Sequence, residues 1–381
     1  MMGQMKILLV GGTGVLSTAV TQQALRKGIE VYMVNRGNRM EWIPEEVHLL
    51  KADIHDEKKI VVLLDNLFFD AVIDFICYTD NELKYSFELF KDRTNQYVFI
   101  SSCAVYSAEA GLDCNEDAPK VNAVWQYSID KNKSEEFLVR LAKNSNTNYT
   151  IIRPAVTYGD TRIPYGITPP YGFHWTLVER IINGKPIITW NKGANFCNIT
   201  HVDDFAVGVV GLLGNEKAFN QAFNVVGDET PTWKEVLDTL SELLNKNAIT
   251  FDISSEYYAE EIPMRKGEIL GSRAANGKCS NQKLKSIIPE FTQQIALKEG
   301  LKRTLAYYKS HNYIYGMDYS FDAETDRIIM KYARKNRKSI KGFNLYYIDY
   351  LQENKWKNKV KYFVVRYCYN LLKVYRAVQK R

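Results

Sequence analysis

The stretch Gly11-Gly12-Thr13-Gly14-Val15-Leu16-Ser17 directly follows the apolar run Met5 to Val10 and precedes a helical pattern at Thr18 to Lys27. Gly11 permits the tight turn that leaves the strand, and Gly14 lets a phosphate approach the backbone. The N-terminus of the next helix offers free N–H groups and a partial positive charge. An ordinary strand-to-helix turn is the alternative, but the position after the first strand favours dinucleotide binding. The residues expected to contact the dinucleotide are Gly11, Thr13, Gly14, Val15 and Leu16.

Short apolar or β-rich runs alternate with helical patterns such as Glu57 to Leu67 through the first half of the chain. This alternation predicts an α/β fold with a doubly wound parallel (Rossmann) sheet and helices on both faces. Ligands of such folds bind at the carboxyl ends of the strands. The runs are Met5 to Val10, Glu30 to Val34, Val47 to Ala52, Ala71 to Phe75, Gln96 to Ser101 and Tyr149 to Arg153.

The pattern becomes irregular after Pro154, beginning with the Pro-, Gly- and Tyr-rich segment 163–172. We therefore predict three segments. Residues 1–155, with parts of 190–230, form the dinucleotide-binding domain. Residues 156–312 form mainly a smaller substrate-binding lobe, and residues 316–381 form a basic, Tyr-rich helical extension.

The composition is that of a soluble globular protein, with 46% hydrophobic and 25% charged residues among 381. The chain has neither an uncharged apolar run of membrane-spanning length nor a signal-peptide pattern at its start, so we expect a cytoplasmic protein. The six cysteines form no C-x-x-C pair and are expected to be reduced thiols. No histidine has a second ligand at useful spacing, so no metal site is predicted.

Positive charge is concentrated at the C-terminal end of the chain. From Arg327 onward there are 16 basic and 2 acidic residues, which leaves 34 basic and 42 acidic residues before it. A general nucleic-acid-binding surface is therefore not indicated. Val360 to Val378 has the period of an amphipathic basic helix, which can dock on its own domain, pair two subunits of a homodimer, or lie on an anionic membrane. Docking or dimerisation is favoured over peripheral membrane contact.

Two further strand ends carry candidate cofactor contacts. Arg36 follows the second strand, where an acid would bind the ribose hydroxyls of NAD. An arginine can instead bind a 2'-phosphate, which favours NADP over NAD, although a solvated surface arginine is the alternative. Asp53 and Ile54 follow the third strand and are placed to meet the adenine, although Asp53 could equally cap a helix.

Tyr127 and Lys131 are four residues apart and share one face of a predicted helix. The ammonium can lower the pKa of the phenol and can also bind the nicotinamide ribose. This spacing is common by chance. Ser102, at a strand end about 25 residues earlier, adds a hydroxyl for the substrate oxygen and favours a catalytic role for all three residues.

With these motifs in place, the chain resembles the extended short-chain dehydrogenases/reductases of the nucleotide-sugar epimerase, dehydratase and reductase group, over about residues 5–312. The resemblance implies that Tyr127 is the acid/base, that Ser102 steadies the same oxygen, and that hydride passes between a sugar carbon and the nicotinamide. It also implies that Pro154 lines the nicotinamide site and Tyr158 the sugar site. The matching pieces are Gly11 to Ser17, Asp53, Ser101 to Tyr106, Tyr127 to Lys131, Arg153 to Gly159, His201 to Asp204, Met264 to Glu268 and Ser280 to Leu284.

One departure from the group's pattern narrows the range of reactions that the chain is expected to catalyse. Dehydratases of the group place an Asp-Glu pair after the catalytic hydroxyl residue, where this chain has Cys103-Ala104. Without that carboxylic acid, elimination of water lacks its catalyst. An epimerase or 4-ketoreductase, for example in polysaccharide biosynthesis, is the remaining expectation.

The substrate is less sharply indicated. Cys197 stands where the group commonly has one diphosphate-binding arginine, whereas Arg265 matches the other. A nucleotide-activated sugar is therefore expected, with a phosphorylated sugar lacking a nucleotide, or a non-catalytic RNA-binding or regulatory relative, as alternatives. His174 and Trp175 either contact a sugar ring or pack the preceding loop, and His201 is expected to be structural.

Overall fold

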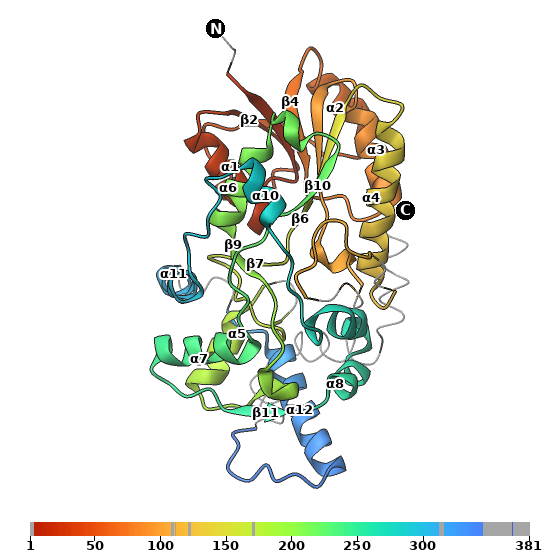
Figure 1. Ribbon diagram of the computed structural model, residues 1–381. Helices are drawn as coiled ribbons and strands as arrows, with labels where there is room; N and C mark the ends of the chain where they lie inside the picture. The colour runs from red at the N-terminus through yellow and green to blue at the C-terminus, as the bar shows by residue number, and fades with distance from the viewer. Residues whose placement is uncertain are drawn as a thin grey trace.

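The computed structural model describes residues 4–107, 110, 112–120, 123–169, 172–311, 316–345 and 368. Its core is a seven-stranded sheet of order β10-β6-β5-β4-β1-β2-β3, in which every neighbouring pair is parallel (Figure 1). The prediction of a doubly wound parallel sheet is thus confirmed. The strands are β1 (Lys6–Val10), β2 (Glu30–Asn35), β3 (His48–Lys51), β4 (Phe69–Asp74), β5 (Thr94–Ile100), β6 (Asn148–Arg153) and β10 (Gln221–Asn224).

The register of the central strands sets the position of the site. Val10 pairs with Val34 on one side and with Asp74 on the other, so β1, β2 and β4 end at the same level. These strands are apolar on both faces because helices cover both, as parallel sheets require. The order reverses between β1 and β4, which opens a crevice at the carboxyl ends.

Helices pack on both faces of the sheet (Figure 1). One side carries α1 (Val15–Arg26), α6 (Val202–Leu212) and α10 (Gln282–Ile287), and the residues between them form one core. The other side carries α2 (Glu57–Leu63), α3 (Asp80–Phe90) and α4 (Gln126–Ala142), around a second core. The strand β10 falls within the segment 190–230, parts of which were assigned to this domain, and α10 overlaps the motif Ser280 to Leu284.

The remaining residues build a second lobe below the sheet in Figure 1, around a separate core that is rich in aromatic side chains. Two short pairs of parallel strands lie in the region after β6, one of β7 with β9 and one of β8 with β11. The elements are β7 (Val156–Tyr158), α5 (Trp175–Ile182), β8 (Ile187–Thr189), β9 (Ile199–His201), α7 (Trp233–Leu244), β11 (Thr250–Asp252), α8 (Ser255–Glu261), α9 (Lys266–Glu268), α11 (Leu297–Ser310) and α12 (Tyr319–Lys335).

The first helix of the C-terminal extension, α12, is built into the second lobe by buried ion pairs. Arg180 of α5 binds Asp322 at 2.6 Å and Asp326 at 2.8 Å, and Lys185 reaches the same two carboxylates. Two cations thus face two anions in an apolar setting, which satisfies the pairing that burial demands. The predicted helix Val360 to Val378 lies outside the described residues. Among the helices that the structure does describe, none has the length and hydropathy needed to span a membrane.

Candidate active site

A cavity of about 1380 Å³ opens at the carboxyl ends of β1, β2, β4, β5 and β6. The sheet supplies the turn after β1 and the ends of β2, β4 and β5, whereas the second lobe supplies Arg162, Cys197 and the segment 270–279. Single small-molecule sites are typically about 300–1,000 Å³. The larger volume here is suited to a dinucleotide together with a second molecule.

The turn after β1 leaves space that fits a phosphate group. Gly11 has φ +84°, and a Cβ there would lie 2.2 Å from Ile76 Cγ2, so only glycine fits. A Cβ on Gly14 would meet only the Ser17 hydroxyl, at 3.4 Å. This open position lies at the first turn of α1, whose N–H groups have no partners within the helix. The chain therefore has the cradle that a dinucleotide needs.

The adenosine end of the cavity is lined by Arg36, Asp53 and Ile54, which the sequence predicted to bind cofactor, and by Arg39, which it did not. Both arginines are exposed, and Arg39 Nη1 lies 3.5 Å from the Thr13 carbonyl oxygen. Asp53 accepts a hydrogen bond from the His55 N–H at 3.0 Å, so part of its role is to shape the turn. Two cations and one carboxylate thus surround the expected ribose position.

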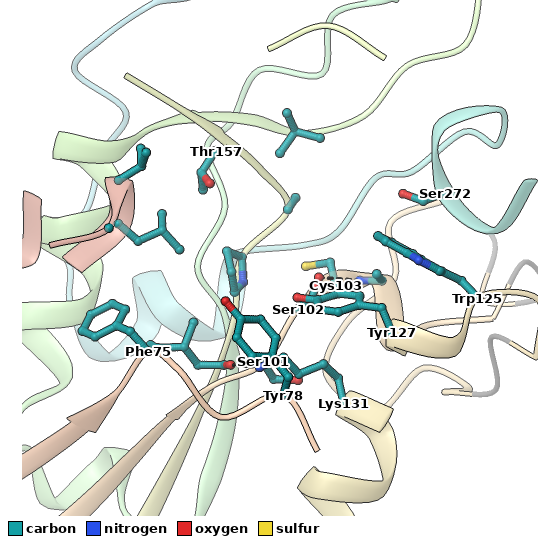
Figure 2. Close-up of a pocket in the computed structure, with 18 of the residues that line it drawn as sticks. Phe75, Tyr78, Ser101, Ser102, Cys103, Trp125, Tyr127, Lys131, Thr157 and Ser272 are labelled. Carbon is teal, nitrogen blue, oxygen red and sulfur yellow. Dashed lines mark hydrogen bonds between the residues drawn. The ribbon is translucent and has the colours of Figure 1, made fainter. Parts of the chain in front are cut away.

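The three predicted catalytic residues meet at the opposite end of the cavity. Tyr127 and Lys131 project from one face of α4 toward the Ser102 side chain (Figure 2). The Ser102 hydroxyl lies near enough to the phenol to lower its pKa, and Trp125 packs on the phenol ring at a centroid distance of 4.8 Å. Burial raises the pKa of Tyr127 to about 12, against the smaller lowering by Ser102. Without a ligand, the phenol is therefore protonated at neutral pH.

The Lys131 ammonium is held in place by backbone oxygens. It donates to the Cys77 carbonyl at 2.5 Å and to the Ile100 carbonyl at 2.8 Å, and its side chain is 2% exposed. A lysine has three N–H donors, so one remains for a ligand. Burial lowers the Lys131 pKa to about 8, because the charged form loses hydration.

Asp74, at the end of β4, fixes the loop that holds Lys131. Its carboxylate accepts hydrogen bonds from the Ile76 and Cys77 N–H groups at 2.9 and 3.0 Å, and from the hydroxyls of Ser86 and Tyr97. The Cys77 carbonyl is thereby aimed at the ammonium. Sequence reasoning missed this residue, because an aspartate at a strand end has many possible roles.

A second buried network fixes the segments on either side of the catalytic serine. Glu135 accepts two hydrogen bonds from Arg153, at 2.9 and 2.7 Å, and one from the Ser101 hydroxyl at 2.6 Å. Arg153 also donates to Tyr106 at 2.8 Å. Burial alone would raise the Glu135 pKa, but the Arg153 hydrogen bonds lower it overall. This ion pair therefore ties Ser101 and Pro154 to α4.

Comparison with known proteins places this site in a family. The model of the NAD dependent epimerase/dehydratase family matches residues 7–226, which is more than half of the chain. The chain belongs to this family. It is therefore an NAD-dependent enzyme by family, and the predictions of the superfamily and of a nicotinamide cofactor are confirmed.

The sequence identity between this chain and individual similar proteins is low. The chloroplast stem-loop binding protein of 41 kDa b of Arabidopsis thaliana is 29% identical over 242 residues, which cover 60% of each chain. A putative UDP-glucose 4-epimerase of Methanocaldococcus jannaschii is 22% identical over 80% of this chain and 99% of its own. The structure of UDP-glucuronic acid 4-epimerase from Bacillus cereus has a TM-score of 0.64 at 18% identity, covering 81% of this chain and 100% of its own. That likeness shows the shared fold.

Two predicted substrate residues of this family member do not line the cavity. Tyr158 is 1% exposed and lies under Gly300 of α11, with its ring edge-on to His201. Arg265 donates to the Thr168 carbonyl at 2.7 Å and to Glu268 at 3.0 Å. Their proposed substrate contacts therefore lack support, and the arginines that line the cavity from the second lobe are Arg162 and Arg273.

His174 and His201 each accept a hydrogen bond from a backbone N–H through Nδ1. His174 Nδ1 accepts from the Ile163 N–H at 2.9 Å and is buried, which lowers its pKa to about 3. His174 therefore packs the Pro- and Gly-rich loop, which is the second of the two roles that the sequence left open for it. His201 Nδ1 accepts from the Asp203 N–H at 3.2 Å and so caps α6. In the described segments, no three His, Cys, Asp or Glu side chains are placed to hold a metal ion.

Cys103 and Cys114 lie with the distant Cys279 on the cavity wall. Cys114 Sγ and Cys279 Sγ are 3.1 Å apart, and Cys103 Sγ donates to the Arg153 carbonyl at 3.2 Å. All are free thiols, as expected. The contact with the Cys279 sulfur, and after it burial, raises the Cys114 pKa, and the Cys279 pKa is raised as well, so the pair is held as neutral thiols.

Proposed function

We propose that this chain is an NAD(P)-dependent epimerase or 4-ketoreductase of a nucleotide-activated sugar, with Tyr127 as the acid/base. The observation that carries this proposal is the meeting of the Tyr127 phenol, the Ser102 hydroxyl and the Lys131 ammonium at one end of a cavity whose other end is the glycine turn. A phenol so placed can exchange a proton with a sugar hydroxyl or ketone.

Each catalytic side chain has one task in this proposal. Tyr127 takes the proton of the sugar hydroxyl on oxidation and returns it on reduction. Ser102 donates a hydrogen bond to the same oxygen, while the Lys131 ammonium, 5.9 Å from the phenol ring, favours the phenolate by charge. When bound, the nicotinamide accepts a hydride from the sugar carbon and can return it.

The wall beside Ser102 favours these reactions over dehydration. Cys103 and Ala104 line the cavity there, and among the lining residues that the structure describes Asp53, at the adenosine end, is the one carboxylate. Removal of water from a sugar needs a carboxylic acid near the reacting carbons to exchange protons. The second lobe, which supplies the other side of the cavity, is the proposed substrate lobe.

Two arginines favour NADP and hence net reduction. Arg36 and Arg39 both line the adenosine end, and a guanidinium pair suits the charge of a 2'-phosphate. An NADP-linked enzyme that exchanges its cofactor performs reduction, whereas an epimerase keeps its cofactor through each turnover. The titration of the protein with NADH and NADPH separates these options, because a tenfold preference for NADPH supports reduction.

The test of the proposed activity is a substrate panel. UDP-, dTDP-, GDP- and CDP-sugars, with their 4-keto forms, are incubated with NAD, NADPH or no added cofactor. Absorbance at 340 nm reports reduction, and proton NMR of the sugar reports epimerisation. Turnover of any one substrate supports the proposal, whereas the absence of any nicotinamide binding would overturn it.

Binding of RNA stem-loops is the competing proposal, because the Arabidopsis relative is named for it. The match covers 60% of that protein, and the residues before Arg327 here carry an excess of acidic over basic groups, 42 against 34. A polyanion is not attracted by such a surface. A gel-shift titration with a hairpin RNA at physiological salt is expected to show no specific complex.

A further inference from the structure

The acid/base residue lies in the first turn of a helix. Trp125 is the N-cap residue of α4 and Tyr127 comes two residues later, while the Trp125 carbonyl accepts from the Ser128 and Ile129 N–H groups at 2.9 and 3.1 Å. An indole has only a donor, so Trp125 cannot accept the N–H hydrogen bond by which a serine or an aspartate caps a helix. The first turn of a helix opens readily without such a cap. Packing must therefore keep Tyr127 in place.

The Trp125 indole packs directly on the acid/base ring. Trp125 lines the cavity, and its ring centroid lies 4.8 Å from that of Tyr127, with 39° between the two planes (Figure 2). Aromatic pairs at such distances attract each other beyond the effect of the area that they bury. The indole also keeps water from part of the phenol, and burial is the largest cause of the raised Tyr127 pKa. The orientation and the hydration of the phenol thus both depend on where the indole lies.

Gly267 of the second lobe touches Trp125 from α9. A Cβ at Gly267 would lie 2.8 Å from Trp125 Cδ1, 3.1 Å from Trp125 Cα and 3.2 Å from the Val124 carbonyl oxygen. A side chain at this position would displace the indole or the start of α4, so glycine permits the contact. Gly267 belongs to the motif Met264 to Glu268, whose residues are all described and none of which lines the cavity. The contact with Trp125 gives this motif a role.

Ion pairs fix the position of Gly267. Glu268 binds Arg265 at 3.0 Å and Arg273 at 3.4 Å, and all three side chains are half-buried or more. An isolated exposed pair contributes little, whereas a network of this kind can hold its segment. Ile269, the next residue, is 0% exposed and belongs to the core of the second lobe. The second lobe therefore sets where Gly267 lies, and through it where the indole lies.

We propose that Gly267, held by the ion pairs of Arg265 and Glu268, keeps Trp125 against the phenol, so that the second lobe positions the acid/base residue. Trp125 and Gly267 are thus positioning residues, which act through Tyr127. This arrangement deepens the proposed function, on which its catalytic consequence rests. A sugar in the cavity would meet a phenol whose direction is fixed by packing from both lobes, and a misplacement of about 1 Å can lower a rate about 100-fold.

Removal of the indole should separate catalysis from binding. With the nucleotide sugar that the wild-type protein turns over, Trp125→Ala is expected to lower kcat by about 30–100-fold, while KM for the sugar and the Kd of NADH change less than about threefold. Trp125→Phe keeps an aromatic ring on the phenol and should restore kcat to within about threefold of the wild-type value. Lys266→Ala, at an exposed lysine of α9, is the matched control and should change none of these values. An unchanged kcat in Trp125→Ala, or a loss confined to KM, would overturn the proposal.

Gly267→Ala tests the same contact from the second lobe and leaves the tryptophan present. Its Cβ would lie 2.8 Å from the indole, so Trp125 must shift, and kcat is expected to fall by about tenfold. In the Trp125→Ala background that indole atom is gone, and Gly267→Ala should then lower kcat less than about threefold. Losses that simply multiply in the double variant would show that Gly267 does not act through Trp125 and would overturn the proposal.

A titration of the phenol requires no turnover. In the ligand-free protein labelled with 13C at tyrosine Cζ, the Tyr127 resonance is the one that Tyr127→Phe removes. Because the Tyr127 pKa is raised to about 12, this resonance should stay in place from pH 8 to pH 10.5 in the wild-type protein. Trp125→Ala admits water to the phenol, lowers its pKa toward the usual 10.0 and should make the resonance move over this range. The other groups that act on the phenol are the same in both proteins: Tyr78, Ser102, Cys103, Lys131, Arg162 and Arg273.

The titration and the kinetics fail independently. A Tyr127 resonance that moves in Trp125→Ala but not in Lys266→Ala would support the positioning contact even if no sugar is turned over, in which case the proposed activity alone fails. A resonance that stays in place in Trp125→Ala would overturn the proposal even for an active enzyme.

Discussion

The buried Lys131 ammonium should leave a signature in the pH dependence of folding. Its pKa falls from 10.5 in an unfolded chain to about 8 in the folded protein. Between these values the unfolded state binds more protons, so the free energy of unfolding rises with pH. At about 1.4 kcal/mol for each pH unit, the full difference is about 3 kcal/mol. At neutral pH the buried ammonium therefore lowers the free energy of unfolding by most of this amount, while its charge is available to a ligand.

Urea unfolding of the wild-type protein and Lys131→Met, followed by circular dichroism at pH 7.5 and pH 10, measures this contribution. The wild-type protein should gain about 2 kcal/mol relative to the variant over that range. Higher pH is avoided because the Tyr127 pKa, raised to about 12, makes that phenol act in the opposite direction above pH 10. Equal changes in the two proteins would refute the reasoning, since Lys131 would then titrate alike in both states.

Three further substitutions test other parts of the structure. Gly11→Ala should weaken nicotinamide binding at least about tenfold by fluorescence titration, because its Cβ would lie 2.2 Å from Ile76; unchanged affinity would remove the turn from the cofactor site. Glu135→Gln should lower the free energy of unfolding by about 3–5 kcal/mol, because Arg153 loses its buried partner. Because the Glu135 pKa is lowered in the folded protein, the wild-type protein should lose this stability as the pH falls through that pKa. Glu135→Gln should lack this loss, and the same dependence of unfolding free energy on acid pH in both proteins would contradict the reasoning. Asp326→Asn should lower the free energy of unfolding in urea by a similar amount, because Arg180 and Lys185 lose a buried partner. A decrease below about 1 kcal/mol would show that these ion pairs do not hold α12 to the second lobe.

The sequence predicted the parts of the site whose chemistry is local. The glycine turn after β1 is a short pattern next to a strand, and a four-residue spacing places Tyr127 and Lys131 on one face of α4. Ser102 followed from its position at a strand end. Parallel sheets bring such ends together, so the pattern of strands was enough to group these residues.

Residues that depend on distant packing could not be predicted. Arg162 and Arg273 reach the cavity through irregular segments of the second lobe, whose paths no periodicity encodes. The motif around Arg265 suggested a substrate contact, yet the turn Ile269–Arg273 brings Arg273 to the cavity instead. The C-terminal charge excess likewise suggested a separate extension, whereas the aspartates Asp322 and Asp326 tie α12 to the second lobe.

The most direct test of the central claim is Tyr127→Phe, assayed on whichever nucleotide sugar the wild-type protein turns over, with Tyr319→Phe on the exposed start of α12 as control. The ring and its packing are kept, and only the phenolic hydroxyl is lost. We expect kcat to fall by about 10²–10⁴-fold, with cofactor affinity within about threefold of the wild-type value. Wild-type turnover by Tyr127→Phe would contradict the assignment of Tyr127 as the acid/base.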